Sequence, residues 1–141
     1  MTKRIIIGSD HGGYNLKLDI IRHLKDSEYE VCDLGCYSEE SCDYPLIAQS
    51  VSKEVLRVSG RGILICGTGV GMSIAANRFD GIRASLCTDT YTAKMTRKHN
   101  NSNILCLGER VVGKGLALEI TDTWLNTDFE GERHQKRIDM I

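Results

Sequence analysis

The sequence lacks any apolar run that approaches the roughly 20 residues needed to span a bilayer, and it has almost no excess of charge of one sign. Its formal net charge is −1 over 141 residues, which argues against broad electrostatic binding to nucleic acid or to a membrane surface. A signal-peptide pattern is also missing, because Thr2-Lys3-Arg4 leads into only three isoleucines. We therefore expect a cytoplasmic protein with neither nucleic acid nor a membrane as a partner.

Cysteine pairs with metal-binding spacing are absent too. The six cysteines contain no C-x-x-C pair, so we interpret them as free thiols in a reducing compartment. Cys87 and Cys106 lie in apolar runs and are expected in the core. A zinc site among Cys32, Cys36 and Cys42 is the alternative, but we expect no metal. At this length and 41% hydrophobic content, the chain can bury one core without disulfides. We therefore expect a single domain that spans residues 1–141.

Short apolar runs alternate along the chain with amphipathic stretches. The runs predict buried strands at residues 3–8, 29–34, 62–66, 82–87 and 103–108. The amphipathic stretches predict helices at residues 14–27, 45–58, 71–79, 89–99 and 113–126, with Gly60 and Gly62 ending the second. Apolar strands joined by helices are typical of a parallel sheet covered on both faces. The predicted fold is therefore an α/β protein, a three-layer α/β/α sandwich around a five-stranded parallel sheet.

A buried strand that ends in Cys66 runs directly into a loop with three glycines, Gly67, Gly69 and Gly71. Glycines expose main-chain N–H groups to a ligand, and the helix expected next adds positive potential that favours a thiolate at Cys66. This predicts an anion-stabilising pocket suited to proton transfer. A buried cysteine beside an ordinary turn is the alternative. A P-loop is disfavoured because Met72 follows Gly71, and a dinucleotide fingerprint fails because its third glycine would fall on Met72.

Ligands of parallel sheets bind beyond the carboxyl ends of the strands. We expect those ends to deliver Asp10-His11, the Cys66 loop, Glu109-Arg110 and, from the end of a helix, His99-Asn100. In the tail, Arg133 and Arg137 are four residues apart, so a helix there would place both guanidinium groups on one face, where they could clamp a phosphate. The alternatives are a solvated charged face for the arginines and ordinary polar roles for the two histidines.

Seven motifs occur in order along the chain. They are Ile7-Gly8-Ser9-Asp10-His11-Gly12, Asp43-Tyr44-Pro45, Ile65-Cys66-Gly67-Thr68-Gly69-Val70-Gly71, Ala75-Ala76-Asn77-Arg78, Gly81-Ile82-Arg83-Ala84, His99-Asn100 and Gly131-Glu132-Arg133-His134-Gln135. Through them the whole chain resembles the B-type ribose 5-phosphate isomerases, whose superfamily also contains the galactose 6-phosphate isomerase subunits. The resemblance implies a Rossmann-like sandwich, a sugar-phosphate substrate, no metal or coenzyme, and a homodimer, or a tetramer, with active sites at the subunit interface.

The resemblance also implies roles for individual residues. Cys66 would be the base that moves a proton between C2 and C1 through an enediolate, and methionine at position 72, where part of the family has a glutamate base, places the chain in the cysteine branch. The loop donors would be Gly67, Thr68, Gly69, Val70 and Gly71. His99 with Asp10 would assist ring opening, Tyr44 and Asn100 would hold sugar hydroxyls, and the phosphate would contact His11, Arg110, Arg133 and Arg137. The tail, residues 127–141, would contribute to the dimer interface.

Two other functions stay open at this stage. Allose 6-phosphate or galactose 6-phosphate could be the substrate on the same scaffold, although His99 disfavours the galactose branch. A flavodoxin-like binding or signalling module is the non-enzymatic alternative. A receiver domain, however, would need an aspartate at Cys66 and a second acid beside Asp10.

Overall fold

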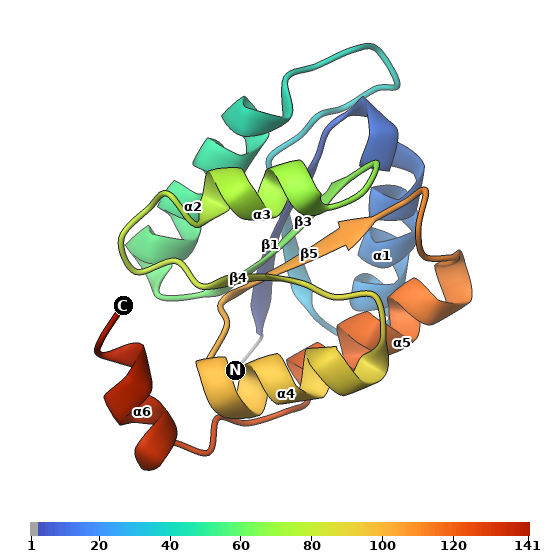
Figure 1. Cartoon of the computed structure of the whole chain (residues 1–141). Helices are drawn as coiled ribbons and strands as arrows, with labels where there is room; N and C mark the ends of the chain where they lie inside the picture. The colour runs from blue at the N-terminus through green and yellow to red at the C-terminus, as the bar shows by residue number, and fades with distance from the viewer. Residues whose placement is uncertain (1–2) are drawn as a thin grey trace.

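The computed structural model describes residues 3–141, which form a five-stranded parallel sheet in the order β2-β1-β3-β5-β4 (Figure 1). The strands are β1 (Arg4–Ser9), β2 (Glu30–Asp33), β3 (Arg61–Cys66), β4 (Ala84–Leu86) and β5 (Ile104–Gly108). The helices are η1 (His11–Gly13), α1 (Tyr14–Asp26), α2 (Tyr44–Val58), α3 (Val70–Ala76), α4 (Thr90–Asn100), α5 (Lys114–Leu125) and α6 (Arg133–Ile138). The predicted strand and helix order is confirmed, and the tail is helical.

Helices cover both faces of the sheet, as the apolar strands require. Alternate residues of the central strands face opposite layers, so that Ile63 packs with α1, α4 and α5 while Leu64 packs with α2 and α3. The predicted core cysteines are confirmed, since Cys87 and Cys106 are both buried. Burial raises the pKa of the Cys87 thiol to about 11, so this thiol stays protonated at neutral pH. No helix within residues 3–141 is long and apolar enough to cross a bilayer.

Gly62 lies inside β3, which confirms the predicted strand at residues 62–66, but it does not end α2 as was also predicted. A methyl group there would come within 2.8 Å of Val55 and 3.0 Å of Val51. The missing side chain therefore lets α2 pack directly against the sheet. The helix ends instead at Ser59, which adopts a left-handed conformation with φ of 52°. Sequence reasoning assigned this role to glycine because glycine adopts that conformation most easily.

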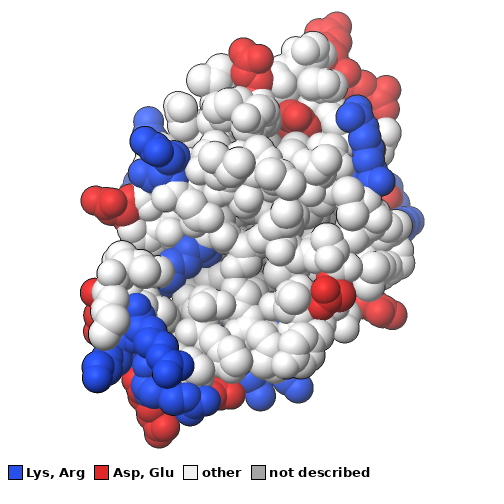
Figure 2. All heavy atoms as spheres, in the orientation of Figure 1, with Lys and Arg blue, Asp and Glu red and all other residues white. Residues whose placement is uncertain are grey.

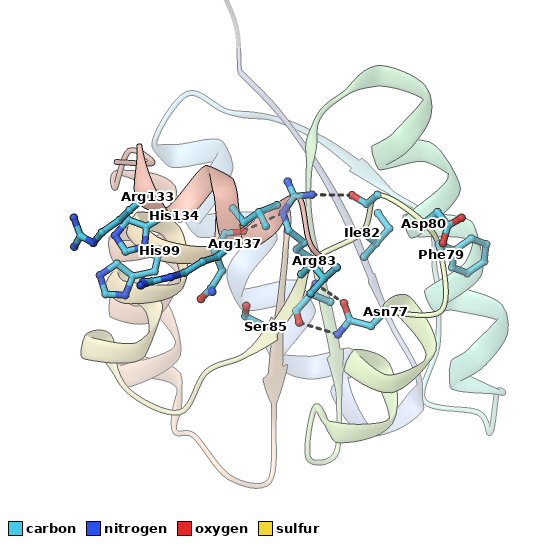
Figure 3. A pocket seen from close by; sticks show the side chains of 15 residues that line it. Asn77, Phe79, Asp80, Ile82, Arg83, Ser85, His99, Arg133, His134 and Arg137 are labelled. Atoms are coloured by element: carbon cyan, nitrogen blue, oxygen red, sulfur yellow. Dashed lines mark hydrogen bonds between the residues drawn. The ribbon is translucent and has the colours of Figure 1, made fainter. Parts of the chain in front are cut away.

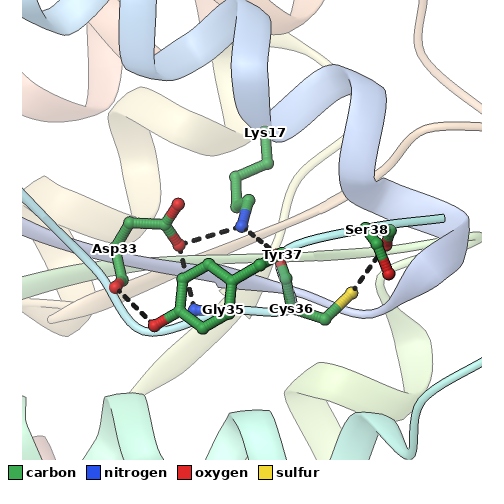
Figure 4. Close-up of polar contacts among 6 residues, drawn as sticks. All are labelled: Lys17, Asp33, Gly35, Cys36, Tyr37 and Ser38. Atoms are coloured by element: carbon green, nitrogen blue, oxygen red, sulfur yellow. Dashed lines mark hydrogen bonds and ion pairs between the residues drawn. The ribbon is translucent and has the colours of Figure 1, made fainter. Parts of the chain in front are cut away.

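A fully buried lysine fixes the loop that leads to α2 (Figure 4). Lys17 of α1 forms a 2.9 Å ion pair with Asp33 at the end of β2 and also donates to the Cys36 carbonyl. Asp33 in turn accepts from the Gly35 amide at 2.9 Å. Because a buried ammonium group is costly unless every donor is matched, this cluster holds the start of the 34–43 segment in one conformation.

Replacing Lys17 by Met should lower the free energy of unfolding by about 2–4 kcal/mol, because Asp33 and the Cys36 carbonyl lose their shared donor. Arg22→Met is the matched control, since Arg22 forms an exposed 3.6 Å ion pair with Asp19 and its loss should cost less than about 1 kcal/mol. Urea unfolding followed by circular dichroism measures both. Equal losses in the two variants would contradict a structural role for the buried pair.

Candidate active site

The carboxyl ends of β1 and β3 bring together the first predicted residues. Asp10 follows β1, and its Oδ1 accepts hydrogen bonds from the amides of Gly12 at 2.9 Å and Gly13 at 3.2 Å. These bonds fix the carboxylate at the start of η1 and leave Oδ2 without a hydrogen bond among residues 3–141. His11 accepts at Nδ1 from the Cys42 amide at 3.2 Å. Since an amide can only donate, neutral His11 carries its proton on Nε2.

The glycine loop folds back over Cys66. The Gly69 amide donates to Cys66 Sγ at 3.0 Å, and Gly69 takes a left-handed conformation with φ of 81° to do so. The thiol is nearly buried, with 6% of the residue exposed. Thr68 is exposed, and its hydroxyl accepts from the Val70 amide at 3.2 Å. The arrangement places the Cys66 sulfur beside the backbone of the glycine loop, with one loop amide donating to it.

Two further predicted residues complete this edge of the sheet. Arg110 follows β5, and its guanidinium group lies against Gly67, where an added methyl group would be 3.1 Å from Nη1. The ring of Tyr44, at the start of α2, lies against Gly71 in the same way, with an added methyl group 2.6 Å from the ring. We name these residues at the carboxyl ends of the strands the carboxyl-edge half-site: Asp10, His11, Tyr44, Cys66, Thr68, Arg110 and the loop glycines.

The remaining predicted residues line a separate cavity of about 1060 Å³ (Figure 3). Arg133 and Arg137 reach it from α6, and His99 and Asn100 from the end of α4. Its other wall includes Arg83, whose Nε donates to the carbonyl oxygens of Asn100 at 3.0 Å and Asn101 at 3.1 Å. We name this second group of residues the tail half-site: His99, Asn100, Arg133 and Arg137.

Within one chain the two half-sites lie apart, so the prediction that His99-Asn100 lies at the carboxyl ends of the strands is wrong. Helix α4 runs back across the sheet after β4, and its last residues therefore lie near the amino ends of the strands, beside α6 (Figure 1). The five residues of β5 alone extend for roughly 16 Å, which is longer than a five-carbon sugar phosphate. Sequence reasoning placed His99 by chain order and did not account for the direction of the helix.

His134 lines the same cavity as the tail half-site, and sequence reasoning did not assign it a role there. Its ring stacks on His99 at 4.4 Å between centroids, and its buried Nε2 lies 3.4 Å from Glu130. Burial, with positive charge on Arg133, lowers the pKa of His134, so the ring is neutral at neutral pH. The motif Gly131-Glu132-Arg133-His134-Gln135 was visible, but no spacing signal pointed to contact with a histidine 35 positions earlier.

Glu130, His99 and His134 are also the group within residues 3–141 whose ligand atoms come close enough to hold a metal, within 4.8 Å of one another. The two imidazole planes, however, are inclined by only 18° in their stack. Ring nitrogens bind metals in the ring plane, so nearly parallel stacked rings do not aim at one ion. Lys98 and Arg133 add positive charge nearby. The geometry favours stacking over metal binding.

Comparison with known proteins places this chain and its fold among sugar isomerases. A model of the ribose/galactose isomerase family matches residues 5–141. Ribose-5-phosphate isomerase B of Escherichia coli strain K12 is 50% identical over 141 residues, covering 99% of this chain and 94% of the relative. The chain therefore belongs to the ribose/galactose isomerase family.

Solved structures of the same family have the same fold as this chain. Ribose-5-phosphate isomerase B of Clostridium thermocellum has a TM-score of 0.96 at 55% identity, over 97% of this chain and 93% of that one. The Mycoplasma genitalium ribose-5-phosphate isomerase B, solved with bound ribulose-5-phosphate, has a TM-score of 0.95 at 45% identity, over 99% of this chain and 94% of that one.

Gly108 keeps the glycine loop in contact with β5, because a methyl group there would lie 2.5 Å from the Thr68 carbonyl oxygen. Gly108→Ala should therefore displace the loop, reduce isomerase activity at least about tenfold and lower the free energy of unfolding by about 1–3 kcal/mol. Gly115→Ala is the control, since nothing lies within 4 Å of that site in α5, and it should keep full activity with slightly raised stability. Wild-type activity in Gly108→Ala would contradict this reading of the loop.

Proposed function

We propose that this protein interconverts ribose 5-phosphate and ribulose 5-phosphate, with Cys66 as the base that removes the C2 proton. The family, the names of its relatives and the bound ribulose-5-phosphate in the Mycoplasma genitalium structure support the substrate. The observation that carries the role of Cys66 is the thiol held among loop amides at the carboxyl end of β3. Proton removal at C2 produces an enediolate, and return of the proton to C1 completes the isomerisation.

The reaction needs negative charge in two places, on the Cys66 sulfur and on the substrate oxygens, and the loop has donors suited to both. The Gly69 N–H donates to Cys66 Sγ, which stabilises negative charge on the sulfur before it takes the proton. As the proton moves, charge develops on the substrate oxygens, and donors already in position stabilise it. Two of the Gly67–Gly71 loop amides, those of Gly69 and Val70, already donate to Cys66 Sγ and to the Thr68 hydroxyl. The other loop amides and the Thr68 hydroxyl are the donors we assign to that oxyanion. Thr68 also lies where it could carry a proton between substrate oxygens.

The other predicted residues act before and around the proton transfer. His99 with Asp10 would open the furanose ring, since a ring oxygen needs a proton donor and the C1 hydroxyl an acceptor. Tyr44 and Asn100 would hold sugar hydroxyls. His11, with its proton on Nε2, and the guanidinium groups of Arg110, Arg133 and Arg137 would bind the phosphate. These roles combine residues from both half-sites.

A homodimer with shared sites accounts for that combination. In the proposed dimer, the carboxyl-edge half-site of one chain meets the tail half-site, on residues 127–141 and the end of α4, of the other, and each chain is one domain. Exposed apolar side chains are available for the contact: Val70 is 45% exposed, Ile74 63% and Tyr91 70%. Figure 2 shows that the face over α3 and β4 carries few charged side chains. A patch of this kind is typical of an interface.

Replacing Cys66 by Ser should reduce kcat for ribose 5-phosphate isomerisation at least about 100-fold while the fold survives, because a hydroxyl is a far weaker base than a thiolate at neutral pH. The measurement is ribulose 5-phosphate formation in a coupled assay, with allose 6-phosphate as the competing substrate.

The matched control is Cys32→Ser, on β2 and away from the glycine loop, which should keep wild-type activity. Joint replacement of Cys32, Cys36 and Cys42 by serine should also be tolerated. Near-normal activity in Cys66→Ser would remove the base role, and faster turnover of allose 6-phosphate by the wild type would overturn the pentose assignment.

Mixing two inactive variants tests the shared site. Cys66→Ala damages the carboxyl-edge half-site and Arg133→Ala/Arg137→Ala damages the tail half-site. If sites are shared, a heterodimer has one intact site and one doubly damaged site, so an equal mixture at exchange equilibrium should recover about a quarter of wild-type activity. If each site belongs to one chain, every site in the heterodimer keeps a defect. No recovery after mass spectrometry confirms subunit exchange would contradict the shared site and leave the isomerase assignment standing.

A further inference from the structure

A second cavity, of about 340 Å³, lies at the amino ends of the strands, away from the carboxyl-edge half-site. It is open to solvent on one side and is lined by the end of α2, the 81–83 segment and the end of α4. Three arginines line it, Arg61, Arg83 and Arg97, together with the neutral polar residues Ser59, Asn101 and Asn103. Among residues 3–141, no Asp or Glu side chain lines this cavity. We name this set of residues the arginine cavity.

The three guanidinium groups contact only neutral acceptors among residues 3–141. Arg61 donates to the Leu125 carbonyl at 3.1 Å. Arg83 donates to the carbonyls of Gly81, Asn100 and Asn101. Arg97 donates to the carbonyls of Thr127 and Ser102 and to Asn101 Oδ1. None of the three forms an ion pair within residues 3–141. The hydrogen bonds hold the arginines in place, but they do not neutralise their charge.

Burial makes this accumulation of charge costly. Arg97 is only 4% exposed. Its pKa is lowered to about 10 by burial and by the positive charges of Arg61 and Arg83, while Asp128 acts in the opposite direction. Burial also lowers the pKa of Arg61, against opposing contributions from Tyr29 and Asp128. Asp128 is exposed, so its charge is screened by water. An anion inside the cavity would relieve the repulsion among the three arginines.

We propose that the arginine cavity is a binding site for a small phosphate dianion, either inorganic phosphate or the phosphate group of a compact monoester. Guanidinium groups suit this ligand because each offers parallel N–H donors that match two phosphate oxygens, and Arg61 uses one hydrogen bond of its five possible donors on residues 3–141. The volume is at the lower end of the range for small-molecule pockets. This site is distinct from the tail half-site, although Gly81 and Arg83 line both cavities.

Trp124 provides a readout that is independent of catalysis. It is the single tryptophan of the chain, it is fully buried, and the guanidinium carbons of Arg61 and Arg97 lie 5.6 and 6.0 Å from its ring centroid. Its indole N–H donates to the Ser102 hydroxyl at 2.8 Å. An anion that draws either guanidinium group toward the cavity changes the environment of the ring, so the single indole cross-peak in a proton–nitrogen NMR spectrum reports binding.

The experiment titrates inorganic phosphate, and separately glycerol 3-phosphate, into the Arg133→Ala/Arg137→Ala variant, in which α6 no longer offers guanidinium groups. A saturable shift of the Trp124 indole peak is expected, absent with sodium chloride at matched ionic strength. Arg61→Gln in that background should weaken phosphate binding at least about tenfold, because a charged pair of hydrogen bonds is lost. Saturation by inorganic phosphate alone would assign the site to the free ion, and saturation by both to the phosphate group.

Two further variants separate loss of the site from loss of structure. Arg57→Gln is the matched control, since Arg57 is exposed, pairs with Glu54 and lies outside the cavity, and it should leave the titration unchanged. Arg61→Lys keeps the charge and the packing stem but loses the paired donors, so it should fold and bind phosphate more weakly than the parent. No indole shift with phosphate, or an equal shift in the parent and in Arg61→Lys, would overturn the proposal.

Discussion

The hydrogen bond from the Gly69 amide to Cys66 Sγ determines how the carboxyl-edge half-site is built. To make it, the loop must reverse direction within three residues, which requires the left-handed Gly69. The reversed loop then lies against β5, where only Gly108 leaves room for the Thr68 carbonyl. The thiol, the loop and the end of β5 are therefore parts of one structure, and a side chain at Gly69 or Gly108 would move the loop that donates to the sulfur.

The direction of α4 sets the second constraint. A crossover helix in a parallel sheet returns the chain to the amino ends of the strands, so residues at its carboxyl end cannot reach a site at the other edge of the same sheet. His99 and Asn100 are in this position, and α6 packs beside them with Arg133 and Arg137. In one copy of this fold, the polar residues that the proposal assigns to one active site lie in two separate groups. This topology is the physical reason for proposing a shared site.

Much of the fold was predictable because the apolar runs of β1, β3 and β5 are continuous and the helices between them are amphipathic. The Cys66 loop was predictable as well, since glycine spacing and a strand-terminal cysteine are local features. Contacts between distant segments were not. The stack of His99 on His134 depends on how α6 packs against α4, and the Lys17–Asp33 pair depends on a loop that closes over α1. The strand position of Gly62 was predictable, but the end of α2 at Ser59 and the close contact of Val51 and Val55 with Gly62 depend on how α2 packs, which no local pattern encodes.

The arginine cavity follows from the same topology. Helices α2 and α4 both end at this cavity, and the last carbonyls of a helix need donors. At the end of α4, Arg83 donates to the carbonyls of Asn100 and Asn101, while Arg97 donates to the Ser102 carbonyl just beyond the helix. The two helix ends carry the equivalent of about one negative charge between them. Three guanidinium groups exceed that charge by about two, and the exposed Asp128 offsets the excess only in part. Capping the end of α4 explains the place of Arg83, and the excess positive charge favours the further anion that we propose, of about the charge of a phosphate.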